Sequence, residues 1–94
     1  MRVFLRFSVC DAPMGSAIQH AGPRIIRCQA ASEVPFASLE IIRNGRVIRR
    51  LEPKKCILDL SFADEGSGDS DYYYVRLTRV DGEITWSSPV WVKT

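Results

Sequence analysis

The sequence predicts an all-β domain, a seven-stranded Greek-key sandwich formed by two packed sheets. Short runs rich in Val, Ile, Phe, Tyr and Trp recur at regular intervals and are separated by turn-forming residues, a pattern typical of such sandwiches. Helical periodicity is nearly absent. With 94 residues, 46% hydrophobic and 26% charged, the chain is expected to form one globular domain, residues 1–94, without room for a second core.

The first third of the chain contains two predicted strands joined by a long loop. The first strand covers residues 2–10, and Arg6 interrupts its apolar run too early for a signal-peptide core. The loop at residues 11–23 is rich in Gly and Pro, which favour turns. The second strand covers residues 24–30, where Ile26 and Cys28 alternate with polar neighbours, as expected of a strand with one buried face.

Two hairpins and one further strand account for the rest. Residues 38–43 and 46–51 flank Asn44-Gly45, a pair typical of tight hairpin turns because both positions need positive φ. Residues 56–62 form the next strand and residues 64–70 a polar loop. The last hairpin pairs residues 71–80 with 83–92 around Asp81-Gly82. Pro89 cannot donate to a sheet, so the last strand should break at residues 87–89.

Strand alternation divides residues 71–80 into an inner and an outer face. Tyr73, Val75 and Leu77 share the face expected to point into the core. Tyr73 is expected to form a tyrosine corner, with its hydroxyl bonded to nearby backbone. Immunoglobulin domains place a cysteine two residues later, but this chain has Val75 there. The predicted sandwich is therefore immunoglobulin/fibronectin-III-like and lacks the intersheet disulfide.

Three cysteines, Cys10, Cys28 and Cys56, cannot all pair within the chain and lack the spacing of zinc or redox sites. Each lies among apolar residues, where a free thiol packs as a small hydrophobic group; one disulfide plus one free thiol is the alternative. This usage favours a reducing, cytoplasmic compartment. No apolar run is long enough for a transmembrane helix, so no membrane partner is expected.

The net charge of +2 is too small to imply nucleic acid. Residues 43–55 carry six positive charges and residues 59–71 carry five negative ones, which describes a basic hairpin followed by an acidic segment. Strand alternation sends Arg49 and Arg50 to opposite faces, which divides the basic charge. No nucleic-acid partner is therefore expected.

No catalytic arrangement is found in the sequence. The one histidine, His20, has no partners at metal-ligand spacing. Ser16 and Ser67 lie beside glycines but lack an accompanying base and the strand-turn-helix context of a nucleophile. No phosphate-binding glycine motif occurs. We therefore expect no enzyme activity in this chain, no cofactor, and no catalytic, cofactor-binding or metal-binding residue.

The acidic loop at residues 64–71 supports an alternative function. Its carboxylates could supply the oxygen ligands that calcium prefers, although their spacing differs from an EF-hand loop. Such loops are more often polar connections rich in turn formers. The alternative is therefore a small ligand-binding β-sandwich module, for carbohydrate or calcium, that uses this loop and a nearby aromatic residue.

Four residues are candidates for a surface that contacts a partner: Tyr72, Tyr74, Arg76 and Trp91. The first three share the outer face of residues 71–80, and Trp91 follows the break at Pro89. Exposed aromatic side chains and arginines are enriched at protein interfaces. The other interpretation is that the rings cover the sheet as cross-strand pairs.

Residues 72–92, YYYVRLTRVDGEITWSSPVWV, resemble the closing segment of a C-terminal immunoglobulin-like β-sandwich module in PHP-type metal-dependent hydrolases, the polymerase-and-histidinol-phosphatase superfamily. Two shorter fragments, residues 13–16 and 42–45, fit the same module. The family's metal-binding residues lie in an upstream catalytic domain, and nothing here matches them. The resemblance implies a non-catalytic accessory domain that packs on a PHP-type catalytic domain or on a second copy of itself.

Overall fold

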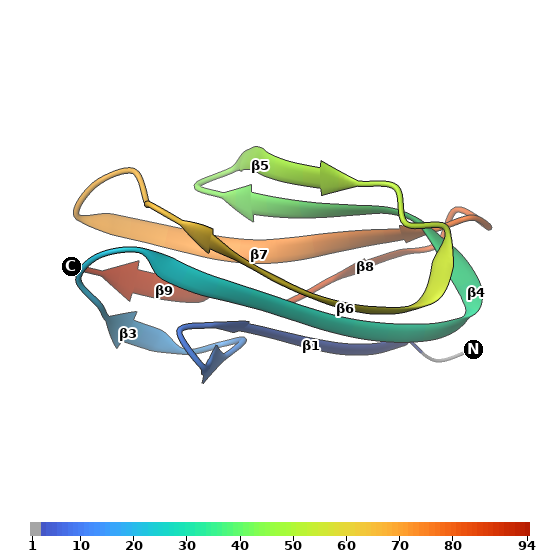
Figure 1. Ribbon diagram of the computed structural model, residues 1–94, viewed down its shortest axis with the longest axis horizontal. Helices are drawn as coiled ribbons and strands as arrows, with labels where there is room; N and C mark the ends of the chain where they lie inside the picture. Colours follow the sequence, from blue (N-terminus) through green and yellow to red (C-terminus); the bar gives the residue numbers. More distant parts are fainter. Residues whose placement is uncertain (1–2) are drawn as a thin grey trace.

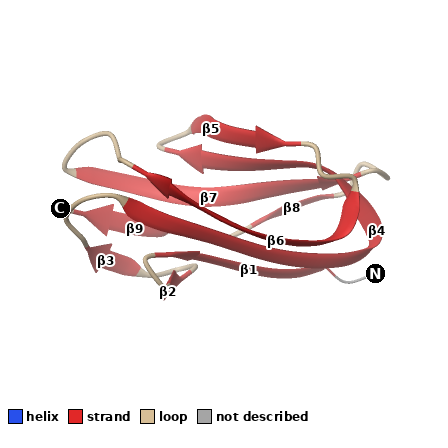
Figure 2. Cartoon of the chain, viewed as in Figure 1, coloured by secondary structure: helices blue, strands red, loops and turns tan. Residues whose placement is uncertain are grey.

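The computed structural model describes residues 3–94, which form nine strands (Figure 1, Figure 2). Apolar and polar side chains alternate along these strands, and turn-forming residues separate them. Their bounds are β1 (Val3–Val9), β2 (Ala12–Pro13), β3 (Ala17–Gln19), β4 (Arg24–Arg43), β5 (Arg46–Leu51), β6 (Lys55–Asp64), β7 (Ser70–Arg79), β8 (Ile84–Trp86) and β9 (Val90–Lys93). No helix occurs in the described range, and hence none there that could cross a membrane. The predicted all-β class is confirmed; Arg2, the first residue of the first predicted strand, lies outside the described residues.

Strand β4 runs for 20 residues and belongs to both layers of the sandwich. Its first half pairs antiparallel with β1 and β6, and its second half with β5 and β7. The pairing registers shift between Ala31 and Ser38, around Pro35, where β4 passes from one layer to the other (Figure 1). The prediction of two separate strands here is wrong, because the bend keeps the strand continuous.

The second layer contains more strands than the sequence predicts. It holds β5, the second half of β4, β7, β8, β9 and β3, whereas the first layer holds β2, β1, the first half of β4, and β6. β3 pairs parallel with β9, so residues 17–19 are a strand and not part of a loop. Because β4 is shared, all nine strands join in one hydrogen-bonded sheet folded over itself.

The predicted turns and the break near Pro89 are found in the structure. Asn44 and Gly45 have φ of 54° and 83°, as a tight hairpin turn requires. The last strand is split into β8 and β9 around residues 87–89. Ser87 holds the break against β7, because its backbone N–H donates to the carbonyl of Val75 and its hydroxyl accepts from the N–H of Val75.

The core lies between the two layers and uses the inner faces of β1, β4, β7 and β9. Tyr73, Val75 and Leu77 are fully buried, which confirms the predicted inner face of β7. Burying such side chains supplies the main favourable term in folding, about 1.5–3 kcal/mol for each large aliphatic group. Cys28 is part of this core, and all three cysteines are free thiols.

Candidate interaction surface

Three aromatic rings line up on the outer face of the second layer. Tyr72 and Tyr74 project outward from β7, and Trp91 lies opposite Tyr72 on β9. The centroids of Tyr72 and Trp91 are 5.0 Å apart, and those of Tyr72 and Tyr74 are 6.4 Å apart with nearly parallel planes. We call Tyr72, Tyr74 and Trp91 the aromatic face. Their contacts are the cross-strand kind that stabilises sheets, yet Trp91 keeps half of its surface exposed.

Arg76 continues the outer face of β7 and is held by Glu40 on β4. Its guanidinium lies 2.6 Å from the carboxylate, which also receives a longer contact from Arg50. Glu40 is 8% exposed, so this carboxylate is shielded and fixes the direction of Arg76. The structure thus brings all four candidate residues onto one surface, with Arg76 as an oriented cation at its end.

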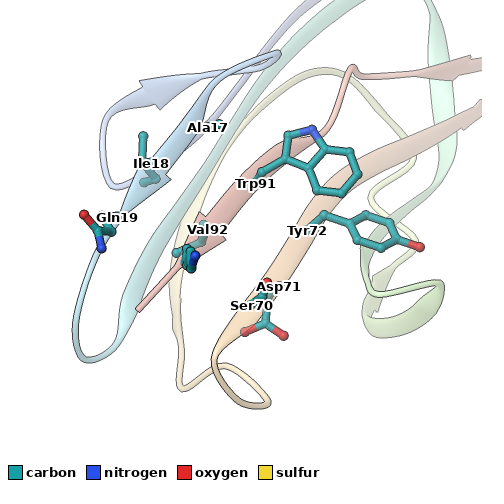
Figure 3. Close-up of a pocket in the computed structure, with 9 residues that line it drawn as sticks. Ala17, Ile18, Gln19, Ser70, Asp71, Tyr72, Trp91 and Val92 are labelled. Atoms are coloured by element: carbon teal, nitrogen blue, oxygen red, sulfur yellow. The ribbon is translucent and has the colours of Figure 1, made fainter.

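A shallow groove of about 480 Å³ borders the aromatic face at β3, β9 and β7 (Figure 3). Trp91 and Tyr72 form one side of it. Two residues further along each of the three strands, the side chains on the same face are polar: Gln19, Lys93 and Ser70. The sequence did not indicate this groove, because the parallel pairing of β3 with β9 joins segments more than 70 residues apart.

Trp86 belongs to the same surface and was not among the predicted residues. It pairs with Arg76 across β7 and β8, so both project outward, and it is 57% exposed. A two-residue turn at Asp81-Gly82 would have placed Trp86 opposite Leu77 on the inner face; in the structure Val80 also belongs to the turn, which moves Trp86 opposite Arg76. On the other side, Ile42 lies between Val47 and Tyr74 and is 2% exposed although it faces away from the core. The outer face is therefore more apolar than the four residues alone suggest.

A buried polar network closes one end of the sandwich. Arg24 donates to Asp71 at 2.6 Å and to the hydroxyl of Tyr73 at 3.1 Å. That hydroxyl donates to Asp64 at 2.6 Å, and Asp64 also accepts from Arg43 at 2.9 Å. The predicted backbone bond of Tyr73 is therefore wrong, because two charged groups from the first layer reach its hydroxyl instead.

The network shifts the pKa values of its members. Burial by itself would raise the pKa of Asp71, but bonds from Ser67 and Arg24 outweigh it and lower the pKa to about 2. Burial likewise opposes ionisation of Asp64, yet bonds from Tyr73 and Arg43 bring its pKa below the ordinary value. Burial and the bond to Asp64 raise the pKa of Tyr73. Both carboxylates are thus ionised and Tyr73 is neutral at physiological pH.

Asp64 and Asp71, the carboxylates at the two ends of the acidic loop (residues 64–71), belong to this network. Asp64 and Asp71 each face an arginine, and Gly66 brings the loop backbone against the guanidinium of Arg24. Within residues 3–94, no group of three His, Cys, Asp or Glu side chains is arranged to hold a metal ion. His20 bonds to the carbonyl of Pro23 at 3.0 Å and lies just after β3.

Comparisons with known proteins connect this chain to longer polypeptides. No family model matches it. Uncharacterized proteins of Chlamydia pneumoniae, Chlamydia trachomatis and Chlamydia muridarum are 31%, 28% and 27% identical to it, over 97% of this chain. The chain spans 18% of the length of each of these relatives. The crystal structure of an engineered protein aligns with this chain at 13% sequence identity and a TM-score of 0.49. The alignment covers 94% of this chain and 20% of the engineered protein.

Proposed function

We propose that this chain is a non-catalytic interaction domain that docks on a neighbouring domain through its aromatic face. The observation that carries the proposal is the exposure of Trp91, which keeps half of its surface free while stacked against Tyr72. Large aromatic side chains beside an oriented arginine, here Arg76, are the groups that anchor protein interfaces. The outward Trp86 and the apolar Val47 widen the same surface.

The proposed architecture is an immunoglobulin/fibronectin-III-like arrangement. The first half of β4, flanked by β1 and β6, resembles one sheet of such domains. The strand order β5, second half of β4, β7 and β9 resembles the other. On this view β8 and β9 are one strand interrupted at Pro89, and β2 and β3 belong to the connection after β1. The proposal follows the resemblance to the C-terminal module of PHP-type hydrolases.

The proposed occupant of the aromatic face is a PHP-type catalytic domain. This chain spans only 18% of the length of its relatives, which leaves room for such a domain in the same polypeptide. A domain interface within one chain commonly buries about 600–1,500 Å², a size that one face of a small sandwich can supply. Catalysis would then reside in that partner, and this chain would position or stabilise it.

The test measures binding of the isolated chain to the Chlamydia pneumoniae relative from which the matching segment has been deleted. We expect binding that Trp91→Lys and Tyr72→Ala each weaken about tenfold or more. Phe4→Ala, on the outer face of the first layer, is the matched control and should leave the affinity unchanged. Absence of binding, or equal affinity for all variants, contradicts the proposal.

The identity of the parent enzyme needs its own assay. The full-length relative should hydrolyse a phosphate ester such as p-nitrophenyl phosphate when a divalent metal is supplied, and a chelator should abolish the activity. If the relative binds this chain in trans but shows no metal-dependent hydrolysis, the docking proposal stands and the PHP parentage is rejected.

A carbohydrate site is the second candidate function, because the groove combines one aromatic wall with polar side chains. Trp91 offers a ring for stacking, and Gln19, Ser70 and Lys93 offer hydrogen-bonding groups on the same side. Titration with neutral oligosaccharides, followed by tryptophan fluorescence, tests this; a response that survives Trp91→Ala counts against it. The calcium version has weaker support, because Asp64 and Asp71 already face arginines, and an unchanged melting temperature at millimolar calcium would eliminate it.

A further inference from the structure

Two strands at the edges of this sandwich, β5 and β6, differ in their ability to pair with the same strand of a second copy of the chain. Among the described residues, β5 and β6 each pair with β4 alone, so each has a second edge without a strand partner. Such edges are templates for pairing with another chain unless charge or shape prevents it. β5 contains Arg46, Arg49 and Arg50 and no acidic residue, so two copies of β5 repel each other.

The first half of β6 has the opposite character. It is free of proline, and its outward-facing residues are Lys55, Ile57 and Asp59. Ile57 is 73% exposed, the most exposed large hydrophobic side chain in the described chain. It ends an apolar row that crosses the first layer from Phe4 on β1 through Ala31 on β4.

We propose that two copies of this chain associate by antiparallel pairing of their β6 strands about a two-fold axis at Ile57. Side chains opposite each other on antiparallel strands share one face, so Ile57 meets Ile57 of the second copy. Residues two positions away then meet in opposite order. Lys55 of each copy faces Asp59 of the other, which produces two ion pairs beside an apolar centre.

Other symmetric registers are less favourable. An axis at Asp59 would oppose two carboxylates, and an axis at Lys55 would oppose two ammonium groups; like charges directly opposite destabilise a sheet. An axis at Leu58 would place Asp59 opposite Ile57, and an axis at Cys56 would place Lys55 opposite Ile57, so neither register forms the Lys55–Asp59 ion pairs. Charge complementarity therefore favours the register centred on Ile57.

Both charged groups are available for the second copy. Lys55 makes no ion pair with any described residue. Asp59 receives contacts from Arg27 at 3.5 Å and Gln29 at 3.3 Å, and both reach the same carboxylate oxygen, Oδ2. The Oδ1 atom is left for the ammonium of the second copy.

The pairing is short, so the dimer should be weak. Five residues of each β6 take part, from Lys55 to Asp59, and Pro53 prevents extension beyond Lys54. Interfaces of this size belong to the transient class, and we expect a dissociation constant on the order of 0.1 mM. This surface lies on the first layer and is separate from the aromatic face, so the two proposals can fail independently.

Sedimentation velocity over about 10 μM to 1 mM of the whole chain tests the dimer. Wild type should shift from monomer toward dimer across this range. Lys55→Asp and Asp59→Lys, each alone, should weaken association about tenfold or more, because each turns two attractions into repulsions. The double variant Lys55→Asp/Asp59→Lys restores opposite charges and should recover dimerisation.

Two further measurements support the sedimentation experiment, and three of its outcomes decide the proposal. Thermal melting of each variant checks that the surface substitutions leave the fold intact. Amide hydrogen exchange of residues 55–59 should slow as the concentration rises, because the free edge becomes hydrogen-bonded. A chain that stays monomeric at 1 mM overturns the proposal, as does a dimer insensitive to Lys55→Asp and Ile57→Lys. A dimer that Trp91→Lys removes and Lys55→Asp does not would assign self-association to the aromatic face instead.

Discussion

Arg24 and Asp71 form a fully buried ion pair, 2.6 Å long, that joins the first residue of β4 to the second residue of β7. Arg24 lies in the first layer and Asp71 in the second, so this contact closes one end of the sandwich with charge rather than with apolar packing. Removing one partner of such a pair commonly costs about 3–5 kcal/mol, because the other is left charged and unpaired in the interior. The predictions on acid stability, Tyr73 and Gly66 concern this network.

Acid should destabilise the fold through Asp71. Its pKa is about 2 in the folded chain and about 4 when unfolded, so it stabilises the fold above pH 4. That contribution, about 2–3 kcal/mol, is lost as the pH falls from 4 to 2. Asp64, whose pKa is also lowered, acts in the same direction. Urea unfolding at a series of pH values measures how the free energy of unfolding depends on pH. Asp71→Asn should flatten this dependence, and an equal pH dependence in the variant and the wild type would refute the role of Asp71.

Tyr73→Phe should be costly although only one oxygen is removed. The hydroxyl accepts from Arg24 and donates to Asp64, and its loss leaves two buried charged groups with one partner fewer. We expect a fall of about 1–3 kcal/mol in the free energy of unfolding. Tyr72→Phe, on the partly exposed outer face, is the matched control and should change stability by less than about 0.5 kcal/mol. Equal effects would contradict the network.

Gly66→Ala should disrupt the same end of the sandwich from the loop side. Gly66 has φ of 84°, and a Cβ there would overlap the guanidinium of Arg24. Gly82 has a similar φ of 90° but open space around it, so Gly82→Ala tests the backbone strain alone. We expect roughly 1 kcal/mol of destabilisation at Gly82 and at least about twice that at Gly66. Denaturant melts of both variants give the difference directly.

The three thiols should differ sharply in reactivity. Cys28 is fully buried, and burial raises its pKa to about 12, so almost none of it is thiolate at neutral pH. Cys10 and Cys56 are partly exposed. Titration of the native chain with a thiol reagent should therefore modify two cysteines quickly and the third only on unfolding. Rapid labelling of all three would mean that the core around Cys28 opens readily.

Local chemistry was predictable from the sequence, whereas long-range pairing was not. The Asn44-Gly45 turn follows from the φ values it needs, and the inner face of β7 follows from alternation of Tyr73 and Val75. The partners of the Tyr73 hydroxyl come from β4 and β6, which no local pattern places beside it. For the same reason the parallel pairing of β3 and the groove beside it were missed.

The candidate surface was predicted only in part. The outward positions of Tyr72, Tyr74 and Arg76 follow from strand alternation. The outward position of Trp86 does not, because a two-residue turn at Asp81-Gly82 would pair it with Leu77, whereas the structure pairs it with Arg76. The continuity of β4 was also unforeseen. Pro35 suggests an interruption in the sequence, whereas in the fold it lies where the strand bends and needs no hydrogen-bonded N–H toward a partner strand.

The length of β4 has a mechanical consequence. Since one uninterrupted ribbon supplies a central strand to each layer, the layers cannot slide past each other or part like the halves of a clamshell without breaking the pairing on both sides of the bend. Any motion of one layer against the other therefore strains a single continuous strand, and we expect the described residues to move as one stiff body.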